Sequence, residues 1–347
     1  MDAGSNPANS ILKKKLIIMT KIIYINKGIE NKIRIDKFLY NYFKKKISRK
    51  KIQIFINKKY ILLNNKTIKK NKKLKINDKI TIINNLKNIK EDNKKLSNIN
   101  LNVKIHYEDN NVIVINKKPG QIVHHGYGNY NNTLIDWLKI KYKDIKNELS
   151  NYRYGLLHRL DKNTSGLLII AKNIYTFKYI NYQFLNQKIK KKYLALIWGI
   201  PKKKKSIIKN YIGRNKKKRI KMMVLNDKKY GKYSITKYKI LKTFKILSLI
   251  KCKLKTGRTY QIRVHLNYIG HPIFNDNLYG GNKITNRYKY INKYKNSIKN
   301  LFKILPRHAL HAYYLSYKDP ISKKYKILIS KLPKDITNAI KYLNKII

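Results

Sequence analysis

The chain has 347 residues and a formal net charge of +66 at pH 7, from 82 Lys and Arg against 16 Asp and Glu. Its hydrophobic share of 43% is enough for a sizeable buried core, which excludes a disordered tail. The charge favours a polyanionic partner, usually nucleic acid. Genomic composition explains the charge equally well, because Lys, Asn, Ile and Tyr all have A/T-rich codons.

The cysteine content and the apolar runs indicate the cellular compartment in which the protein works. Cys252 is the only cysteine, which excludes an intramolecular disulfide and favours a reducing compartment. We interpret Cys252 as a core residue, because it lies in the predicted strand "KILSLIKCKLK". No apolar run approaches the roughly 20 residues of a membrane helix, and no small-residue cleavage site follows "KLIIMTKIIYI". We therefore expect a cytoplasmic protein that does not contact a membrane.

The length predicts about two domains, preceded by an extension. Residues 1–31 open with the lysine-free stretch "MDAGSNPANS", and we expect an extension with Met19 as the natural start. Residues 33–43 have helical spacing, and Ser48 is expected to cap a second helix, "RKKIQIFINK". Strands are predicted over "YILLNN" and "DKITII". The side chains that these two helices should turn inward are Ile35, Phe38, Leu39, Tyr42, Phe43, Ile52, Phe55 and Ile56.

The unit expected over residues 32–84 resembles the alpha-L RNA-binding fold of a small-subunit ribosomal protein. The matching segments are "RIDKFL" from Arg34, "SR" at Ser48, and "LLN" from Leu62. That family usually has glycine where this chain has Lys59 and Asn65, so we expect a looser first turn. The resemblance and the basic outer faces of the helices predict RNA contacts through Arg34, Lys37, Arg49 and Lys50. Residues 85–102 lack periodicity and are the predicted linker.

Residues 103–347 predict a larger domain of mixed helices and strands. The predicted strands are "NVIVIN", "GLLIIAK", "KKYLALIWG", "SITKYKILKTF", "ILSLIKCKLK", "HALHAYYLSY" and "KYKILIS". The predicted helices lie in "TLIDWLKIKY", "IYTFKYINYQFLNQKI", "TGRTYQIRVHLNYIG" and "PKDITNAIKYLNKI", the second of which should bury Phe177, Ile180, Phe184 and Leu185. No strict βαβ alternation is present, which favours an α+β class with a mostly antiparallel mixed sheet flanked by helices.

Sequence motifs exclude several kinds of site. The chain has no GxxxxGK[ST] phosphate loop and no dinucleotide fingerprint, and its histidines and single cysteine lack zinc spacing. His124 and His125 are adjacent, so on an extended chain they should point apart rather than form a metal pair.

Three segments remain that could carry chemistry. They are "HRLDKNTSGLLIIAK" with Asp161, "KKYLALIWG" with Tyr193, and "LKTGRTYQIRVHLNYIGHPIFND" with Arg263. Taken singly, each residue has a structural explanation. Asp161 would cap a turn, Tyr193 would fill the core, and Arg263 would lie on a helix surface.

Together the three segments resemble the core motifs of the RluA/RluD-type pseudouridine synthases, in the same order and at similar spacing. "GQIVHHGYGN" and "PRHALHAYYLSYKDP" extend the resemblance, which covers about residues 103–335. The stretch "VHHGYGN" is most similar to the large-subunit enzymes labelled D. Tyr260 stands where the family usually has histidine, which affects the tuning of the site rather than the reaction.

The resemblance implies that Asp161 is the nucleophile that turns uridine in RNA into pseudouridine, a task for an ionised carboxylate. It implies that Arg263 pairs with Asp161 and that Tyr193 stacks on the uracil and can transfer a proton. Arg159 would fill the space left by the flipped-out nucleotide.

The same resemblance implies no metal, no redox cofactor and no bound nucleotide. We expect a monomer that acts on ribosomal RNA, free or within a pre-ribosomal large subunit. A tRNA uridine as substrate, or a non-catalytic RNA-binding ribosome-assembly factor, remain alternatives. A pure RNA binder would have no reason to hold Asp161, Tyr193 and Arg263 together, because a carboxylate repels phosphate.

Overall fold

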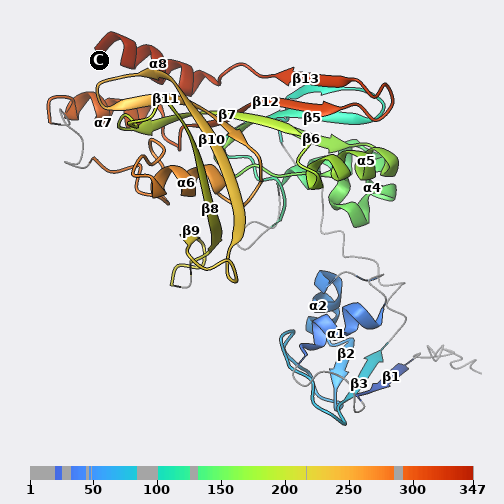
Figure 1. Ribbon diagram of the computed structural model, residues 1–347. Coiled ribbons are helices and arrows are strands. Elements are labelled where there is room, and N and C mark those ends of the chain that lie inside the picture. Colours follow the sequence, from blue (N-terminus) through green and yellow to red (C-terminus); the bar gives the residue numbers. More distant parts are fainter. Residues whose placement is uncertain are drawn as a thin grey trace, which may run out of the picture. The chain divides into compact units, whose positions relative to one another are not determined.

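The computed structural model describes residues 20–25, 33–43, 47, 49–83, 101–125, 132–215, 217–284 and 292–346. The chain divides into two compact units, residues 1–94 and residues 95–347 (Figure 1). Several sequence expectations fall outside the described residues. These are Met19 as a start, Ser48 as a cap, residues 85–100 of the linker, residues 126–131 of the "VHHGYGN" region, and the side chain of Lys50.

Within the described residues, the small unit has an antiparallel sheet and two helices. The sheet order is β1 (Thr20–Tyr24), β3 (Lys79–Ile83), β2 (Ile61–Leu63), and the helices are α1 (Ile35–Tyr42) and α2 (Arg49–Asn57). Strand β1 lies in the stretch that the sequence assigned to the extension. It pairs with β3 along its whole length, and its Ile23 is buried in the core of the unit. Ile22 is exposed, so the strand has no clean alternation to reveal it.

The buried faces of α1 and α2 follow the predicted spacing with one exception. Ile35 and Leu39 lie four residues apart and are fully buried, as expected of one helix face. Ile52, Phe55 and Ile56 of α2 are buried as predicted. Tyr42 is 39% exposed, so its predicted inward orientation is wrong. As the last residue of α1, it turns its ring toward the Phe38 ring and the Lys21 ammonium instead.

The large unit is built on one long, mostly antiparallel sheet. Its strand order is β4-β5-β6-β12-β7-β11-β10-β8-β9, and β13 pairs with β12. The bounds are β4 (Ile105–Glu108), β5 (Val112–Lys117), β6 (Ser165–Ala171), β7 (Lys190–Trp198), β8 (Lys205–Arg214), β9 (Met222–Leu225), β10 (Lys232–Thr243), β11 (Leu247–Leu254), β12 (Leu310–Lys318) and β13 (Tyr325–Ile329). The predicted α+β class with a mostly antiparallel mixed sheet is confirmed.

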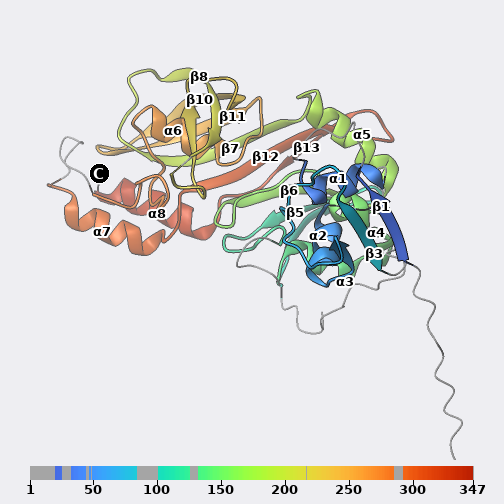
Figure 2. The same cartoon turned by 90° about the horizontal axis from the view of Figure 1, so that it is seen from below.

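Helices cover the two ends of this sheet and the region next to β8 and β10. They are α3 (Leu134–Lys141), α4 (Lys143–Glu148), the 3-10 helix η1 (Ser150–Gly155), α5 (Ile174–Leu185), α6 (Gln261–Tyr268), α7 (Lys295–Ile304) and α8 (Lys334–Ile346). In both views α5 lies at the end of the sheet near β6, whereas α7 and α8 lie at the other end (Figures 1 and 2). No helix in the described part of the chain is long and apolar enough to cross a membrane.

The antiparallel order of the strands is interrupted between β6 and β12. They are joined as a parallel pair through His311–Ser165 and Ala312–Gly166. Gly166 has a φ of +117°, and a Cβ there would lie 2.2 Å from the carbonyl oxygen of Ala312. Only glycine fits this close approach, which places the start of β6 against β12.

The face of α5 departs from the prediction at one position. Ile180 is fully buried, whereas Leu185 is 73% exposed, so its predicted burial is wrong. Leu185 ends the helix, and the chain leaves the sheet surface there through Asn186 and Gln187, which has a positive φ.

Candidate active site

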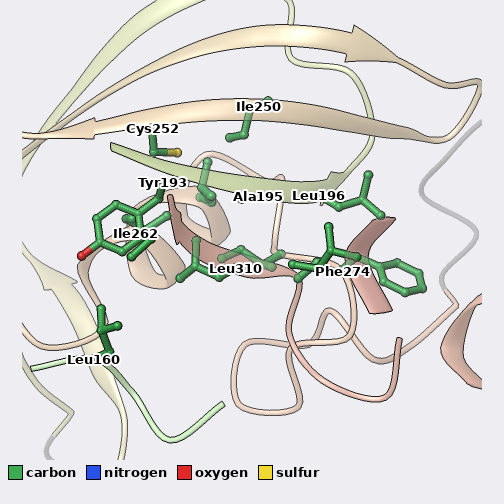
Figure 3. Close-up of a cluster of buried hydrophobic side chains, with 14 of the residues drawn as sticks. Leu160, Tyr193, Ala195, Leu196, Ile250, Cys252, Ile262, Phe274 and Leu310 are labelled. Atoms are coloured by element: carbon green, nitrogen blue, oxygen red, sulfur yellow. The ribbon is translucent and has the colours of Figure 1, made fainter. Parts of the chain in front are cut away.

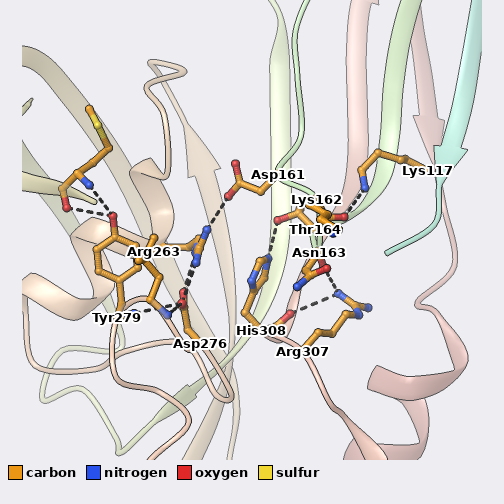
Figure 4. A network of polar contacts seen from close by, with 12 residues as sticks. Lys117, Asp161, Lys162, Asn163, Thr164, Arg263, Asp276, Tyr279, Arg307 and His308 are labelled. Atoms are coloured by element: carbon orange, nitrogen blue, oxygen red, sulfur yellow. Dashed lines mark hydrogen bonds and ion pairs between the residues drawn. The ribbon is translucent and has the colours of Figure 1, made fainter. Parts of the chain in front are cut away.

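Asp161 lies in a tight turn directly before β6. The backbone N–H of Thr164 donates to the carbonyl oxygen of Asp161 at 3.1 Å and closes the turn. The Lys162 carbonyl accepts from the N–H of Gly120 at 2.9 Å and from the Nζ of Lys117 at 2.8 Å (Figure 4). Both donors lie at the end of β5 or just after it, so that strand helps to fix the turn that carries Asp161.

Lys117 is fully buried and its ammonium is held by backbone carbonyls. Its Nζ also donates to the carbonyl oxygens of Lys118 and Gln121, both at 2.9 Å. Burial, and then the charge of Arg307, lower the pKa of Lys117 to about 7, although the charge of Asp161 opposes the shift. The sequence predicted no role for this lysine, because its partner at Lys162 comes from a turn 45 residues away.

The other side of the turn is held by residues that precede β12. Arg307 donates from Nη1 to the carbonyl of Asn163 at 2.9 Å. Its Nε and Nη2 donate to the two carboxylate oxygens of Asp335 at 2.7 and 3.1 Å. The Oγ1 of Thr164 lies 2.8 Å from Nε2 of His308, a buried ring whose pKa burial lowers to about 3. Residues at the end of β5 and residues that precede β12 therefore both hold the turn, which limits the positions that Asp161 can take.

The Asp161 carboxylate is paired with Arg263. Arg263 donates from Nη1 to Oδ2 of Asp161 at 3.2 Å. The same guanidinium donates from Nε and Nη2 to the two oxygens of Asp276 at 2.7 and 2.8 Å. The structural explanation of Arg263 as a surface residue is thus wrong, since it is 7% exposed and joins two carboxylates.

Two tyrosine rings flank the Arg263 guanidinium. The guanidinium carbon lies 4.6 Å from the ring centre of Tyr260 and 5.2 Å from that of Tyr279. Tyr260 precedes α6 with a left-handed φ of 57°, which turns its ring toward the first helical turn and Arg263. The Tyr279 hydroxyl is fixed by the backbone N–H and carbonyl of Met222. Cation–π contacts of this kind stabilise a buried guanidinium, and Tyr260 makes one of them.

Burial and the ion pair act on Asp161 in opposite directions. Its side chain is 18% exposed, and burial raises the pKa of the carboxyl. The charge and hydrogen bond of Arg263, and then the charge of Arg159, lower it, but they do not cancel the effect of burial. The pKa of Arg263 is raised, because its two carboxylate partners outweigh its own burial. The guanidinium therefore stays charged, and it favours the ionised form of Asp161.

Tyr193 lies on β7 within the hydrophobic core that borders Asp161. It is paired directly with Cys252 of β11 and shares one buried cluster with Leu160, Ile262 and Cys252 (Figure 3). Burial, and to a lesser degree the charge of Asp161, raise the pKa of Tyr193, so its phenol stays protonated at neutral pH. Burial also raises the pKa of the Cys252 thiol to about 12, and its predicted place in the core is confirmed.

Arg159 lies at the surface of the same loop, two residues before Asp161. Its Nη1 lies 3.0 Å from Nε2 of His124. His125 turns to the carboxylate of Asp136 instead, at 2.8 Å, so the prediction that the two histidines point apart is confirmed. The loop of Asp161 and the chain after β5 are thus in contact through side chains as well as backbone.

The four basic residues predicted in the small unit differ in their surroundings. Arg34 and Arg49 both donate to the buried Asp36, at 2.9 and 2.8 Å. Lys37 is exposed, and the side chain of Lys50 lies outside the described residues. The arginines therefore have a structural task, while Lys37 is free to face a partner.

Three of the predicted site residues are therefore brought together. Asp161, Tyr193 and Arg263 come from three segments far apart in sequence and meet around one partly exposed carboxylate. Asp276 belongs to the same group, although its segment alone predicts no role for it. An ionised carboxylate in a buried, arginine-supported setting can act as a nucleophile toward an electron-poor carbon.

Comparisons with known proteins identify the family to which the chain belongs. The family model of RNA pseudouridylate synthase matches residues 111–268. A Chlorobaculum parvum protein described as an uncharacterized RNA pseudouridine synthase is 34% identical over 314 residues, which are 89% of this chain and 93% of the relative. Ribosomal large subunit pseudouridine synthase D of Buchnera aphidicola subsp. Schizaphis graminum is 38% identical over 299 residues, 83% of this chain and 89% of the relative.

A solved structure shares the fold of the large unit. Human RNA pseudouridylate synthase domain containing 1 aligns with a TM-score of 0.50 and 26% identity, over 67% of this chain and 84% of the human chain.

Fold and site together define an RNA-modifying isomerase. The chain belongs to the RNA pseudouridylate synthase family, and it is an RNA pseudouridine synthase. The resemblance inferred from "HRLDKNTSGLLIIAK" and its two companion segments is confirmed.

Proposed function

We propose that this enzyme converts uridines of large-subunit ribosomal RNA to pseudouridine, with Asp161 as the nucleophile. The observation that carries the proposal is the pairing of a partly exposed Asp161 with the charged Arg263 beside Tyr193. Of the two carboxylates that pair with Arg263, Asp161 has an 18% exposed side chain, whereas the side chain of Asp276 is fully buried.

The reaction is an exchange of one glycosidic bond for another. The bond from ribose C1′ to uracil N1 breaks while the Asp161 carboxylate takes up or stabilises the electron-poor sugar. The detached uracil then rotates, its C5 bonds to C1′, and the carboxylate leaves. The hydrogen on C5 departs as a proton, and N1 gains one. No atom is lost from the nucleotide overall, and splitting the substitution into two steps lowers the barrier of each.

Arg263 favours the ionised form of Asp161 and orients its carboxylate. Burial alone would favour the neutral acid, which is a poor nucleophile. The guanidinium opposes that shift and orients one carboxylate oxygen through Nη1. Because Asp276 holds Nε and Nη2, Arg263 keeps its position when Asp161 is engaged with the sugar.

Tyr193 is proposed to contact the uracil. Its raised pKa keeps the phenol neutral at pH 7, so the hydroxyl can donate a hydrogen bond or relay a proton but is not a strong base. Its ring offers a flat apolar surface on which a pyrimidine can stack. A uridine reaches this depth only when it is flipped out, and the exposed Arg159 is placed to take up the vacated position in the RNA.

The small unit is proposed to hold RNA through its alpha-L-type fold over about residues 32–84, connected by a linker over 85–102. Lys37 is exposed on α1, and the unit contains no candidate nucleophile of its own. Phosphate contacts of this kind position an RNA without reading its sequence, so the choice of uridine falls to the large unit.

The choice of substrate is supported by the relatives named ribosomal large subunit pseudouridine synthase D, with 36–38% identity over most of the chain. It is tested by incubating the purified protein with unmodified large-subunit rRNA, small-subunit rRNA and tRNA transcripts, followed by mapping of pseudouridines. We expect modification at defined positions of the large-subunit transcript. Modification confined to tRNA would overturn the substrate assignment while leaving the reaction intact.

A further inference from the structure

One sheet carries the active site on one face and a dense array of lysines on the other. Tyr193, Thr236 and Cys252 face the core, and Thr236 bonds Gln261 and His265 of α6 at 3.0 and 2.8 Å. Because side chains alternate along a strand, their neighbours point to the opposite face. We call this opposite surface the lysine face; it consists of Lys190, Lys192, Lys205, Lys209, Lys237, Lys239, Lys251 and Lys253, none of which is buried.

These lysines are aligned across the strands rather than scattered. Lys253 lies directly opposite Lys192 on one side and Lys237 on the other. In the next row Lys239 lies opposite both Lys251 and Lys205. Neighbouring strands are about 4.8 Å apart, which is well inside the Debye length of about 8 Å at physiological ionic strength.

Directly opposed like charges destabilise a sheet, and each one makes its neighbour's charged form less favourable. Burial lowers the pKa of Lys253, and the charges of Lys255, Lys192, Lys190 and Lys237 lower it further.

Acidic residues are scarce in the part of the sequence that forms this face. Asp227 is the only Asp or Glu between Asp161 and Asp276 in the sequence, and its carboxylate accepts from the N–H of Lys229 in its own turn. Among the ion pairs formed by the described residues, none involves a lysine of the lysine face.

The lysine face also contains a hollow and borders tyrosine rings. A hollow of about 380 Å³ lies at one end and is lined by Lys188, Lys190, Lys253, Lys255, Lys318 and Tyr325. The Nζ of Lys192 lies 3.9 Å from the ring centre of Tyr314, and that of Lys190 lies 5.2 Å from Tyr325. Lysines interleaved with tyrosines around a concave surface suit a phosphate backbone with neighbouring bases.

We propose that the lysine face binds the phosphate backbone of a second RNA segment, behind the sheet that presents Asp161. A folded RNA would then contact both faces of the sheet, with the reacting uridine on one side and a phosphate backbone on the other. The inference rests on RNA as the substrate, and it does not depend on the choice of large-subunit rRNA. The lysines of the lysine face stand in register across four neighbouring strands, and this alignment sets them apart from lysines scattered over a surface.

The test compares two triple variants of the full chain that remove the same charge. The first is Lys237→Gln, Lys239→Gln and Lys253→Gln on the lysine face. The control is Lys295→Gln, Lys299→Gln and Lys303→Gln, three exposed residues on successive turns of α7. Each protein is titrated with a long, structured rRNA fragment and with a short hairpin that fills only the active site, at several salt concentrations.

The lysine-face variant should lower the slope of log affinity against log salt for the long RNA by about 2, since each neutralised phosphate contributes about 0.7–0.9 to that slope. Turnover of the short hairpin should be unchanged, and the melting temperature without RNA should rise as repulsion is relieved. The control should change the slope by clearly less.

Equal slopes for the two triple variants would overturn the proposal, because the effect would then be one of net charge. Loss of hairpin turnover in the lysine-face variant would assign these lysines to the active site and would also overturn it. The proposal would also be overturned if the lysine-face variant bound the long RNA normally but no longer bound phosphatidylserine vesicles or polyglutamate. A wild-type protein that fails to turn over the hairpin contradicts the proposed function, while the salt slopes still decide the role of the lysine face.

Discussion

Arg263 is bound more firmly to Asp276 than to Asp161. Two hydrogen bonds of 2.7 and 2.8 Å join its guanidinium to Asp276, whereas one of 3.2 Å joins it to Asp161. Asp276 is in turn held by the backbone N–H groups of Leu278 and Tyr279. Arg263 is thus fixed by a buried partner, and its remaining Nη1 is available to the reactive carboxylate. Asp276 therefore holds Arg263 in place whether or not Asp161 is engaged with the sugar.

Asp276→Asn should therefore damage both stability and turnover. The amide keeps the shape but places an NH₂ donor against guanidinium donors and leaves Arg263 short of one acceptor. Breaking a buried pair of this kind costs about 3–5 kcal/mol, and kcat should fall at least tenfold because Arg263 is no longer held. Thermal melting and tritium release measure the two effects. Asp319→Asn, in the turn between β12 and β13, is the matched control and should leave kcat unchanged. An Asp276→Asn enzyme with wild-type kcat would show that the pair has no part in positioning.

The Arg263 variants should shift the pH dependence of activity. Burial raises the pKa of Asp161, and Arg263 opposes the shift, so removing the guanidinium raises that pKa further. The reaction needs the ionised form, which means that the rising limb of the pH profile moves to higher pH. Arg263→Ala should move it most, and Arg263→Lys less, because lysine keeps the charge but loses the planar fork. Superimposable profiles for wild type and both variants would refute the ion-pair role.

Tyr193→Phe separates the ring from its hydroxyl. Phenylalanine keeps the flat surface for stacking, so RNA affinity and KM should change little. If the hydroxyl takes part in proton transfer, kcat should fall on the order of 10²-fold. Tyr193→Leu removes the ring as well and should raise KM in addition. Single-turnover kinetics on a short RNA distinguish the two effects, and a Phe variant with full kcat would limit Tyr193 to stacking.

The small unit should govern affinity rather than chemistry. Deleting residues 1–84 should weaken binding to a structured rRNA fragment and flatten its salt dependence, by about 0.7–0.9 in slope for each phosphate that the small unit neutralises. The turnover number on a short substrate and the modified position should stay the same. A lower melting temperature of the large unit with an unaltered salt slope would instead mean that the small unit only stabilises its neighbour.

The sequence was most informative where a residue's role can be inferred from its own segment. The strands that follow Asp161 and carry Tyr193 are apolar runs that can be recognised in the sequence, and the motifs around Asp161, Tyr193 and Arg263 carry the family resemblance. The second partner of Arg263 could not be predicted, because a bidentate pair with Asp276 depends on the geometry of two separate segments. Lys117 is a similar case, since one lysine among the many of this chain becomes special only through burial beside the turn at Lys162.

The errors at the element level have related physical causes. Tyr42 and Leu185 lie at the last turns of α1 and α5, where the helix ends and the side chain no longer has to follow the buried stripe. Strand β1 was missed because its Ile22 and Tyr24 face outward, which hides the alternation that the buried Ile23 would otherwise reveal. Helix ends and edge strands of this kind are fixed by tertiary contacts rather than by local pattern.

Asp161→Asn should be a folded protein, and more stable than wild type at neutral pH. The pKa of Asp161 is higher in the folded protein than in the unfolded chain. At a pH above both values the carboxyl is ionised in both states, and the buried negative charge lowers the free energy of unfolding. Asparagine removes that cost, while Arg263 keeps its two bonds to Asp276. The gain in melting temperature should shrink as the pH falls toward about 4, where the unfolded carboxyl is also protonated. This separates loss of activity from loss of structure.

The most direct test of the account is tritium release from RNA labelled at uracil C5, measured for wild type and for Asp161→Asn. Bonding of C5 to the sugar expels the label, so release counts isomerisation events. We expect steady release by the wild type and none by the variant above background, although the variant binds the RNA as tightly as the wild type or slightly more tightly. Release by Asp161→Asn within tenfold of the wild-type rate would contradict the assignment of Asp161 as the nucleophile.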